Sequence, residues 1–238
     1  MDISPDWIVY YQYGPFVINK TIVLTWLVMG ILVCGSWLVT RRLVRPQDLT
    51  PEELASGKRI PRGQTVLESI VVESAKQIDD VMQVSARGLL PFLGTLFLYI
   101  LVSNLLGAVP GFDSPTGSLS TTVALSLCVF IMVPAYGIFR GGIRTYLKVY
   151  VQPSPFMLPL NIFSELSRTM ALAVRLFGNI MSGRVMGMIL LIIAPLFVPV
   201  VMQLLGLLIG VVQAYIFAVL AAVYIAAGIE TDQQHMNE

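Results

Sequence analysis

Residues 185–229, VMGMILLIIAPLFVPVVMQLLGLLIGVVQAYIFAVLAAVYIAAGI, form a continuous stretch without a charged residue. A helix needs about 20 mostly apolar residues to cross the roughly 30 Å hydrocarbon core of a membrane. This stretch is too long for one crossing, and Pro195 and Pro199 interrupt it. It therefore predicts the end of one membrane helix, a turn, and a second membrane helix.

Three shorter uncharged stretches precede it, at 21–40, 88–112 and 114–139, and each fits one crossing. The chain of 238 residues is 56% apolar and 12% charged, whereas soluble domains are nearer half apolar and a quarter charged. The net charge of +1, with no basic face or tail, gives no reason to expect a nucleic-acid partner. The composition predicts an all-α integral membrane protein.

The predicted elements include one helix that lies on the membrane rather than across it. In residues 64–85, apolar positions recur at helical spacing between charged ones, which is typical of an interfacial amphipathic helix. The full order is a tail (1–20), a span (21–40), a loop (41–63), the amphipathic helix (64–85), two spans (88–110 and 117–139), a loop (140–155), two long tilted hairpin helices (156–193 and 200–228) and a tail (229–238).

The distribution of Lys and Arg predicts the orientation. Basic residues gather in the loops 41–63 and 140–155, and such loops stay on the cytoplasmic side of membrane proteins. Both loops are cytoplasmic only if the N-terminus and the 110–116 connector lie outside. This arrangement gives about five crossings and a cytoplasmic C-terminus.

Charged residues inside the fourth predicted span are the strongest functional signal. An arginine at the centre of a membrane helix costs about 2.5–3.5 kcal/mol on insertion scales, so it usually faces a partner or a water-filled path. Helical geometry places six polar residues on one face: Asn161, Glu165, Arg168, Arg175, Asn179 and Ser182. Glu165 and Arg168 are close enough to pair, in which case they would only hold helices together and take no part in transport. Arg175 has no acidic residue within helical reach, so its partner is expected on another protein.

Two neighbouring features are less specific. Arg184 lies nine residues after Arg175 and so points to another face, where it could reach the membrane interface or line a separate path. On the last helix, one face combines glycines that permit close helix packing with an amide near mid-membrane. Its members are Gly206, Gly210, Gln213, Phe217, Leu220 and Tyr224.

Four motifs together resemble subunit a of the F-type ATP synthase membrane sector, of the bacterial type. The strongest is LAVRLFGN at 172–179, preceded by Arg168 and Glu165. The others are VQAYIF at 212–217, SNLLGAVPG at 103–111 and TTVAL at 121–125, and all four occur in the family's order.

The resemblance implies a stator that works beside a rotating ring of c subunits in a bacterial inner membrane. The family's arginine, matched by Arg175, attracts the carboxylate of each passing c subunit, and two offset aqueous half-channels connect that carboxylate to the two sides. Subunit b, the remaining ATP synthase subunits, the lipid bilayer and the transported protons are the other implied partners. The residues expected to hydrate or gate the path are Glu165, Arg168, Asn179, Gln213, Asn104 and Arg184.

Three positions depart from the family pattern. Arg184 replaces an acidic residue or histidine, Gly206 replaces a histidine in some members, and Thr169 replaces a common proline. The single histidine, His235, lies in the predicted tail, so no buried imidazole is available to relay protons. These differences leave a sodium-coupled member as an alternative.

Two other classes of function stay open on the residues alone: a stand-alone transporter or channel, and a non-conducting scaffold whose polar stripe only joins helices. An enzyme is not expected. The sequence has no Gly-rich phosphate loop, no metal-ligand cluster and no nucleophile–base pair, so we predict no catalytic, cofactor or metal site.

Overall fold

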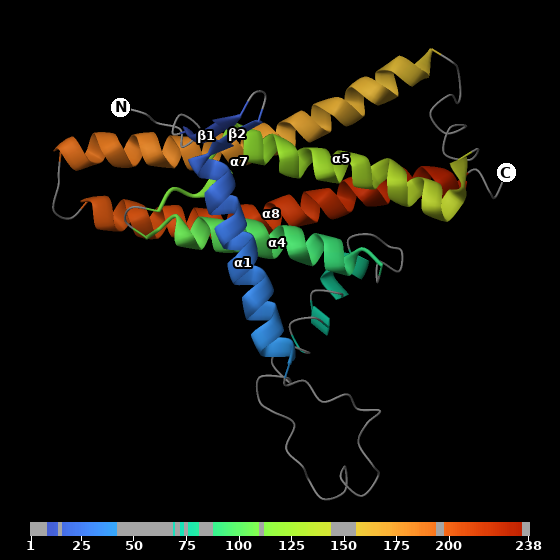
Figure 1. Ribbon diagram of the computed structural model, residues 1–238. Coiled ribbons are helices and arrows are strands. Elements are labelled where there is room, and N and C mark those ends of the chain that lie inside the picture. The colour runs from blue at the N-terminus through green and yellow to red at the C-terminus, as the bar shows by residue number, and fades with distance from the viewer. Residues whose placement is uncertain are drawn as a thin grey trace, which may run out of the picture.

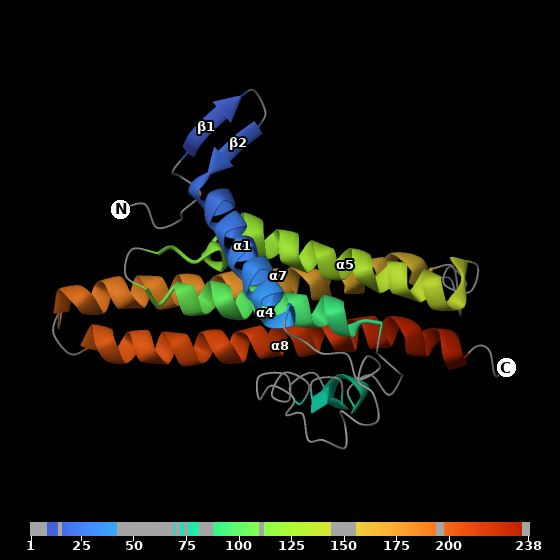
Figure 2. The same cartoon turned by 60° about the horizontal axis from the view of Figure 1, so that its bottom comes forward.

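The computed structural model shows several helices side by side and one helix that crosses them. It describes residues 9–13, 16–41, 69, 72–73, 76–80, 88–109, 112–143, 156–193 and 198–234. Its helices are α1 (Lys20–Thr40), α4 (Leu90–Leu106), the short 3-10 helix η3 (Pro115–Gly117), α5 (Leu119–Gly141), α7 (Met157–Ile193) and α8 (Val198–Gln234). α4, α5, α7 and α8 lie alongside one another, and α1 crosses them steeply (Figures 1 and 2).

The predicted all-α membrane class is confirmed. Four helical segments are long and apolar enough to cross a membrane, namely Lys20–Thr40, Leu119–Phe139, Leu158–Ile193 and Val200–Ala227. α4 is also apolar but has 17 residues, which is about 26 Å of helix at 1.5 Å per residue. It therefore reaches slightly less than the thickness of the hydrocarbon core.

The ends of two helices differ from the predicted ranges. α4 stops at Leu106, before Gly107, rather than continuing to 110; Gly107 and the nearby Pro110 both disfavour further helix. α8 continues to Gln234 instead of ending at 228. The added residues include Glu and Gln, which favour helix, so Gly228 alone does not end it.

A short β-hairpin precedes α1 and was not predicted from the sequence. β1 (Val9–Tyr13) pairs antiparallel with β2 (Phe16–Asn19), and Tyr13 lies opposite Phe16. The signal was present, because both segments are rich in aromatic and β-branched residues and flank Gly14-Pro15. In Figure 2 the hairpin projects beyond the first turn of α1.

The predicted amphipathic helix at 64–85 falls largely outside the described residues. Residues 69, 72–73 and 76–80 are helical, and Val72 and Glu73 are exposed. The predicted interfacial position of this segment stays a prediction.

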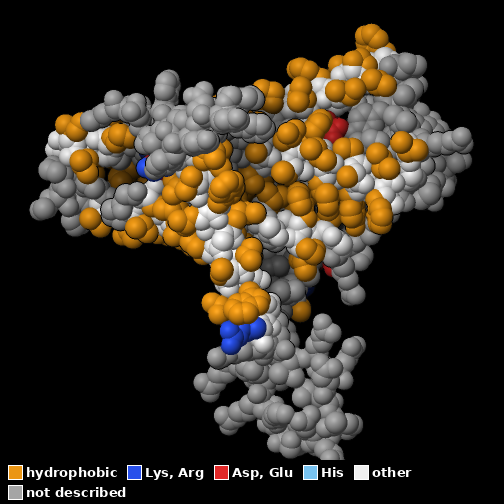
Figure 3. Space-filling model, in the orientation of Figure 1, with side chains coloured by type: hydrophobic (Ala, Val, Ile, Leu, Met, Phe, Trp, Pro, Cys, Tyr) orange, Lys and Arg blue, Asp and Glu red, His pale blue; other side chains and the backbone are white. Residues whose placement is uncertain are grey.

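The core of the bundle lies around α8, which packs against α4, α5 and α7. Small buried residues of α8, such as Ala214, Ala221 and Ala222, share one core cluster with larger ones such as Leu93 of α4. Small residues at membrane-helix contacts allow close backbone approach. Many large apolar side chains are exposed on the helices, and on the face in Figure 3 they far outnumber the charged ones, as expected where lipid replaces water.

Candidate ion-translocation site

The hairpin of α7 and α8 has one register, fixed by two side-chain contacts. The Arg168 guanidinium lies 5.7 Å from the centroid of the Tyr224 ring, and Asn179 Nδ2 donates to Gln213 Oε1 at 3.5 Å. Arg168 and Asn179 are eleven residues apart, as are Gln213 and Tyr224, so both contacts belong to the same antiparallel alignment.

This register places Arg175 level with Phe217 of α8, on the opposite side of α7 from the core. Phe217 is buried, and so are Leu172 and Leu176 on either side of Arg175. The Arg175 side chain is exposed, next to Val174, which is 59% exposed. Within the described ranges no carboxylate forms an ion pair with Arg175. A permanent cation therefore lies on an apolar outer face of the hairpin.

Two other polar residues of the α7 stripe, Arg168 and Asn179, contact α8. Glu165 and Asn179 are half-buried, whereas Arg168 is exposed and stacks on Tyr224. The predicted pairing of Glu165 with Arg168, which would only hold helices together, stays a prediction.

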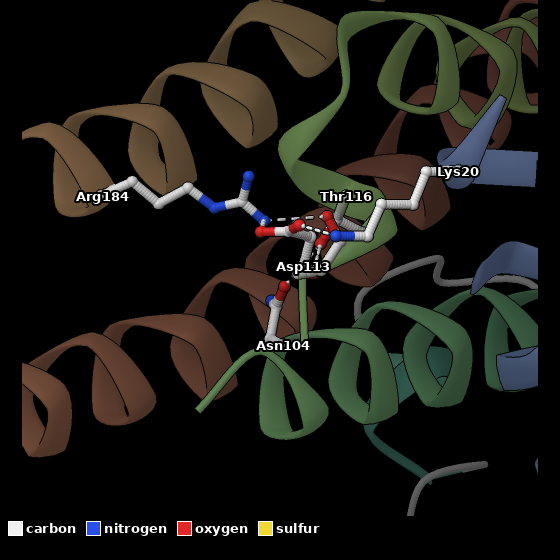
Figure 4. A network of polar contacts seen from close by, with 6 residues as sticks. Lys20, Asn104, Asp113, Thr116 and Arg184 are labelled. Atoms are coloured by element: carbon white, nitrogen blue, oxygen red, sulfur yellow. Dashed lines mark hydrogen bonds and ion pairs between the residues drawn. The ribbon is translucent and has the colours of Figure 1, made fainter. Parts of the chain in front are cut away.

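A second polar cluster joins four elements at the segment between α4 and α5 (Figure 4). Asp113 contacts two cations: its Oδ2 is 2.6 Å from Lys20 Nζ, at the start of α1, and its Oδ1 is 3.9 Å from Arg184 Nη2, on α7. Arg184 Nη2 also donates to the carbonyl oxygen of Ser114 at 3.2 Å. We call Lys20, Asp113 and Arg184 the charged triad.

A line of hydrogen bonds leads from the triad toward α8. The Ser114 and Thr116 hydroxyl oxygens are 2.6 Å apart, and the Thr116 hydroxyl donates to Asn104 Oδ1 at 2.8 Å. Asn104 Nδ2 in turn donates to the carbonyl oxygen of Gly210 at 2.9 Å. Ser114 and Thr116 are buried. Buried hydroxyl and amide groups thus connect the 112–118 segment to the middle of the hairpin.

The line of hydrogen bonds ends at Gly210, one helical turn before the residue of α8 that contacts α7. Gln213 lies three residues after Gly210, on the same side of α8, and is 6% exposed. Its Nε2 is buried and has no hydrogen-bond partner among the described residues, whereas its Oε1 accepts from Asn179. Asn179 lies one turn after Arg175. We call the residues Ser114, Thr116, Asn104, Gln213 and Asn179 the polar path.

Three glycines leave room for these polar side chains. A Cβ at Gly117 would lie 2.9 Å from Arg184 Cζ, one at Gly107 would lie 2.9 Å from Ser114 Cβ, and one at Gly210 would lie 2.9 Å from Asn104 Cβ. Real Cβ atoms are not found so close to other heavy atoms, so each position requires glycine or a shift of its neighbour. A Cβ at Gly206 would meet nothing within 4 Å, so the close packing that this glycine permits is not made by any described part of the chain.

Comparison with known proteins assigns this fold to a family. The sequence model of the ATP synthase A chain family matches residues 22–226. The chain belongs to the ATP synthase A chain family. It is 53% identical to ATP synthase subunit a 2 of Acaryochloris marina, over 99% of this chain and 96% of the relative. It is 52% identical to ATP synthase subunit a 1 of Chlorobaculum parvum, over 98% of this chain and 99% of the relative.

Membership of the ATP synthase A chain family makes this chain a non-catalytic, membrane-embedded component of a bacterial ATP synthase, with the other subunits of that complex as its partners.

The structure brings together some of the sequence-predicted site residues and separates others. Asn179 meets Gln213, and Asn104 is joined through Thr116 and Ser114 to the segment that binds Arg184. Arg184 contacts the 112–118 segment, and its predicted place at the membrane interface stays a prediction. Arg175, Glu165 and Arg168 lie away from that cluster, along the other part of α7. His235 is outside the described residues.

Asp113 and Lys20 were not predicted as site residues. A signal for Asp113 existed in the sequence, because it is the only charged residue between Gly88 and Phe139. No comparable signal marks Lys20. It lies 93 residues from Asp113 in the chain, and only the crossing of α1 over the bundle brings the two together.

Proposed function

We propose that this chain is the stator subunit a of a rotary F-type ATP synthase in a bacterial inner membrane, and that it conducts ions past Arg175 to the c-ring. The observation that supports it best is the exposed Arg175 cation on an apolar helix face, without a carboxylate partner among the described residues. Such a charge is costly in a membrane unless a partner reaches it.

A carboxylate on a c subunit would supply that partner. The guanidinium of arginine is a cation in proteins, so the carboxylate would meet a positive charge at Arg175. At about 4 Å and an effective dielectric constant of about 20, opposite unit charges attract by about 4 kcal/mol. This attraction favours the ionised carboxylate, so it promotes release of the bound ion as each c subunit arrives.

The polar path would form part of the half-channel that opens to the outer side, and Glu165 and Arg168 would lie toward the cytoplasmic one. This assignment uses the orientation that the basic loops predict, with the N-terminus outside and the C-terminus in the cytoplasm. The buried, unpaired Nε2 of Gln213 supports a hydrated path, because a water molecule would satisfy that donor. Subunit b and the c-ring would cover other parts of the hairpin.

The transported ion is proposed to be the proton, with sodium as the second candidate. One observation favours sodium: the polar path consists of neutral hydroxyl and amide groups, with no titratable side chain between Asp113 and Gln213. Oxygen ligands of this kind suit hydrated sodium as well as protonated water.

Inverted membrane vesicles containing the whole complex test the proposal. We expect ATP-driven acidification with the native chain and none with Arg175→Ala, when both complexes are equally assembled. Arg175→Lys is the matched variant that keeps a cation but allows it to lose its proton, and we expect it to pump poorly. Sodium uptake in place of acidification would change the ion and keep the mechanism, whereas equal pumping by Arg175→Ala would favour the non-conducting scaffold.

A further inference from the structure

We propose that Asp113 is a positioning residue that holds the Arg184 cation aside at the outer mouth of the polar path, so that ions pass it. The inference rests on the proposed function and adds to it a role for the charged triad. It begins from the geometry of one carboxylate that contacts two cations on different helices.

The Arg184 guanidinium is held from two sides. Asp113 Oδ1 and the Ser114 carbonyl oxygen both lie near its Nη2, at 3.9 Å and 3.2 Å. Gly117 provides the surface behind it, because a Cβ at that position would overlap the guanidinium. The Arg184 side chain is 20% exposed, so it is held against the 112–118 segment rather than extended into solvent.

The triad lies at the beginning of the polar path. Ser114, which accepts from Arg184 through its carbonyl oxygen, contacts Thr116 through its hydroxyl. Arg184 is thus at the point where an ion would enter or leave. Two cations and one anion give this point a net charge of +1, and without Asp113 it would be +2.

Loss of the carboxylate would change both the charge and the position of Arg184. Its long side chain would keep one hydrogen bond to a backbone carbonyl but lose its counter-ion. An unneutralised arginine at the mouth would repel protons and sodium ions alike. The charge that lines a cleft changes the local concentration of an ion and its rate of entry by about tenfold or more.

Two alternative roles for Asp113 are an ion carrier and a tether for α1. Its 2.6 Å contact with Lys20 joins the first residue of α1 to the bundle, and only Thr21 and Val28 of α1 are buried. These roles make a different prediction from ours, because only the positioning role depends on the charge of Arg184.

The test uses the whole complex with Asp113→Asn, Arg184→Gln and the double variant. The readout is the rate of ATP synthesis in inverted vesicles as the ion concentration in the lumen is varied. We expect Asp113→Asn to raise the apparent KM for the lumenal ion about tenfold, with equal assembly and equal ATP hydrolysis by the uncoupled complex. The double variant should return the apparent KM to within about twofold of that of Arg184→Gln alone.

Asp80→Asn is the matched control, since Asp80 is an exposed carboxylate outside the cluster. The proposal is overturned if the double variant is as impaired as Asp113→Asn, because that result would indicate that Asp113 is an ion carrier or a tether. It is also overturned if Asp113→Asn behaves as the native chain. Arg175→Ala in the same vesicles tests the proposed function separately. Continued ATP synthesis by Arg175→Ala refutes the proposed function. Loss of ATP synthesis in Arg175→Ala, together with native behaviour of Asp113→Asn, refutes only this inference.

Discussion

Replacing Gly210 by alanine should disrupt the contact between α8 and α4. The new Cβ would lie 2.9 Å from Asn104 Cβ and 3.5 Å from both Cγ and Nδ2 of that residue. Ordinary contacts begin near 3.4 Å, so the two helices must separate locally by about half an ångström or the side chain must turn. Either response strains the hydrogen bond from Asn104 Nδ2 to the Gly210 carbonyl oxygen.

The expected cost is the sum of two terms. Overpacking of a well-packed core costs about 1–3 kcal/mol, and a hydrogen bond between membrane helices contributes about 0.6 kcal/mol on average. Their sum, about 1.6–3.6 kcal/mol, corresponds to about a 15- to 430-fold change in a rate constant, since each 1.36 kcal/mol is a factor of ten. We expect subunit a to be lost from the detergent-solubilised complex faster by a factor in this range, as measured by its half-life at elevated temperature.

Gly206→Ala supplies the matched control, because it makes the same chemical change one turn earlier on α8. A Cβ at Gly206 would meet nothing within 4 Å, and alanine favours helix over glycine by about 1 kcal/mol. This variant should therefore be as stable as the native chain or more stable. Equal half-lives for Gly206→Ala and Gly210→Ala would refute the packing argument.

Two further predictions concern the 112–118 segment. Gly117→Ala should leave stability close to native, because the atoms that it displaces are the flexible end of Arg184. It should nevertheless raise the apparent KM for the lumenal ion, as Asp113→Asn does. An unchanged KM would show that the position of the guanidinium is unimportant. Thr116→Val keeps the side-chain shape but leaves Asn104 Oδ1 without its donor. This loss should lower the stability by about 1–3 kcal/mol and slow ATP-driven pumping. A native pumping rate would contradict a role for the polar path.

Much of the candidate site could be predicted because it depends on one helix. Arg175, Glu165, Arg168 and Asn179 belong to α7, and the 100° step of a helix fixes which of its residues share a face. The expectation that Arg175 lacks a carboxylate within this chain likewise followed from the absence of acids in the surrounding apolar sequence. It agrees with the exposed, unpaired guanidinium among the described residues.

The connections of Arg184 and Asn104 could not be predicted in this way. Arg184 binds Ser114, 70 residues away, and Asn104 binds Gly210, 106 residues away. Contacts of this kind depend on how helices pack, and no local pattern specifies the packing. The same reason applies to Gly206, since glycine permits close approach without showing whether a neighbour is present, and a Cβ there would meet nothing within 4 Å.

The sequence by itself determined that this chain is a bundle of apolar helices in a membrane, and that one of them bears a cation, Arg175, with no acidic residue within helical reach. Both properties are local: the length of an uncharged stretch decides whether it can span the lipid, and helical periodicity decides which side chains align. Only the tertiary structure decided that α1 crosses the other helices and that Lys20, Asp113 and Arg184 meet. Their meeting depends on the packing of helices that are distant in the chain, where small residues and buried hydrogen bonds select one arrangement among many with similar hydrophobicity.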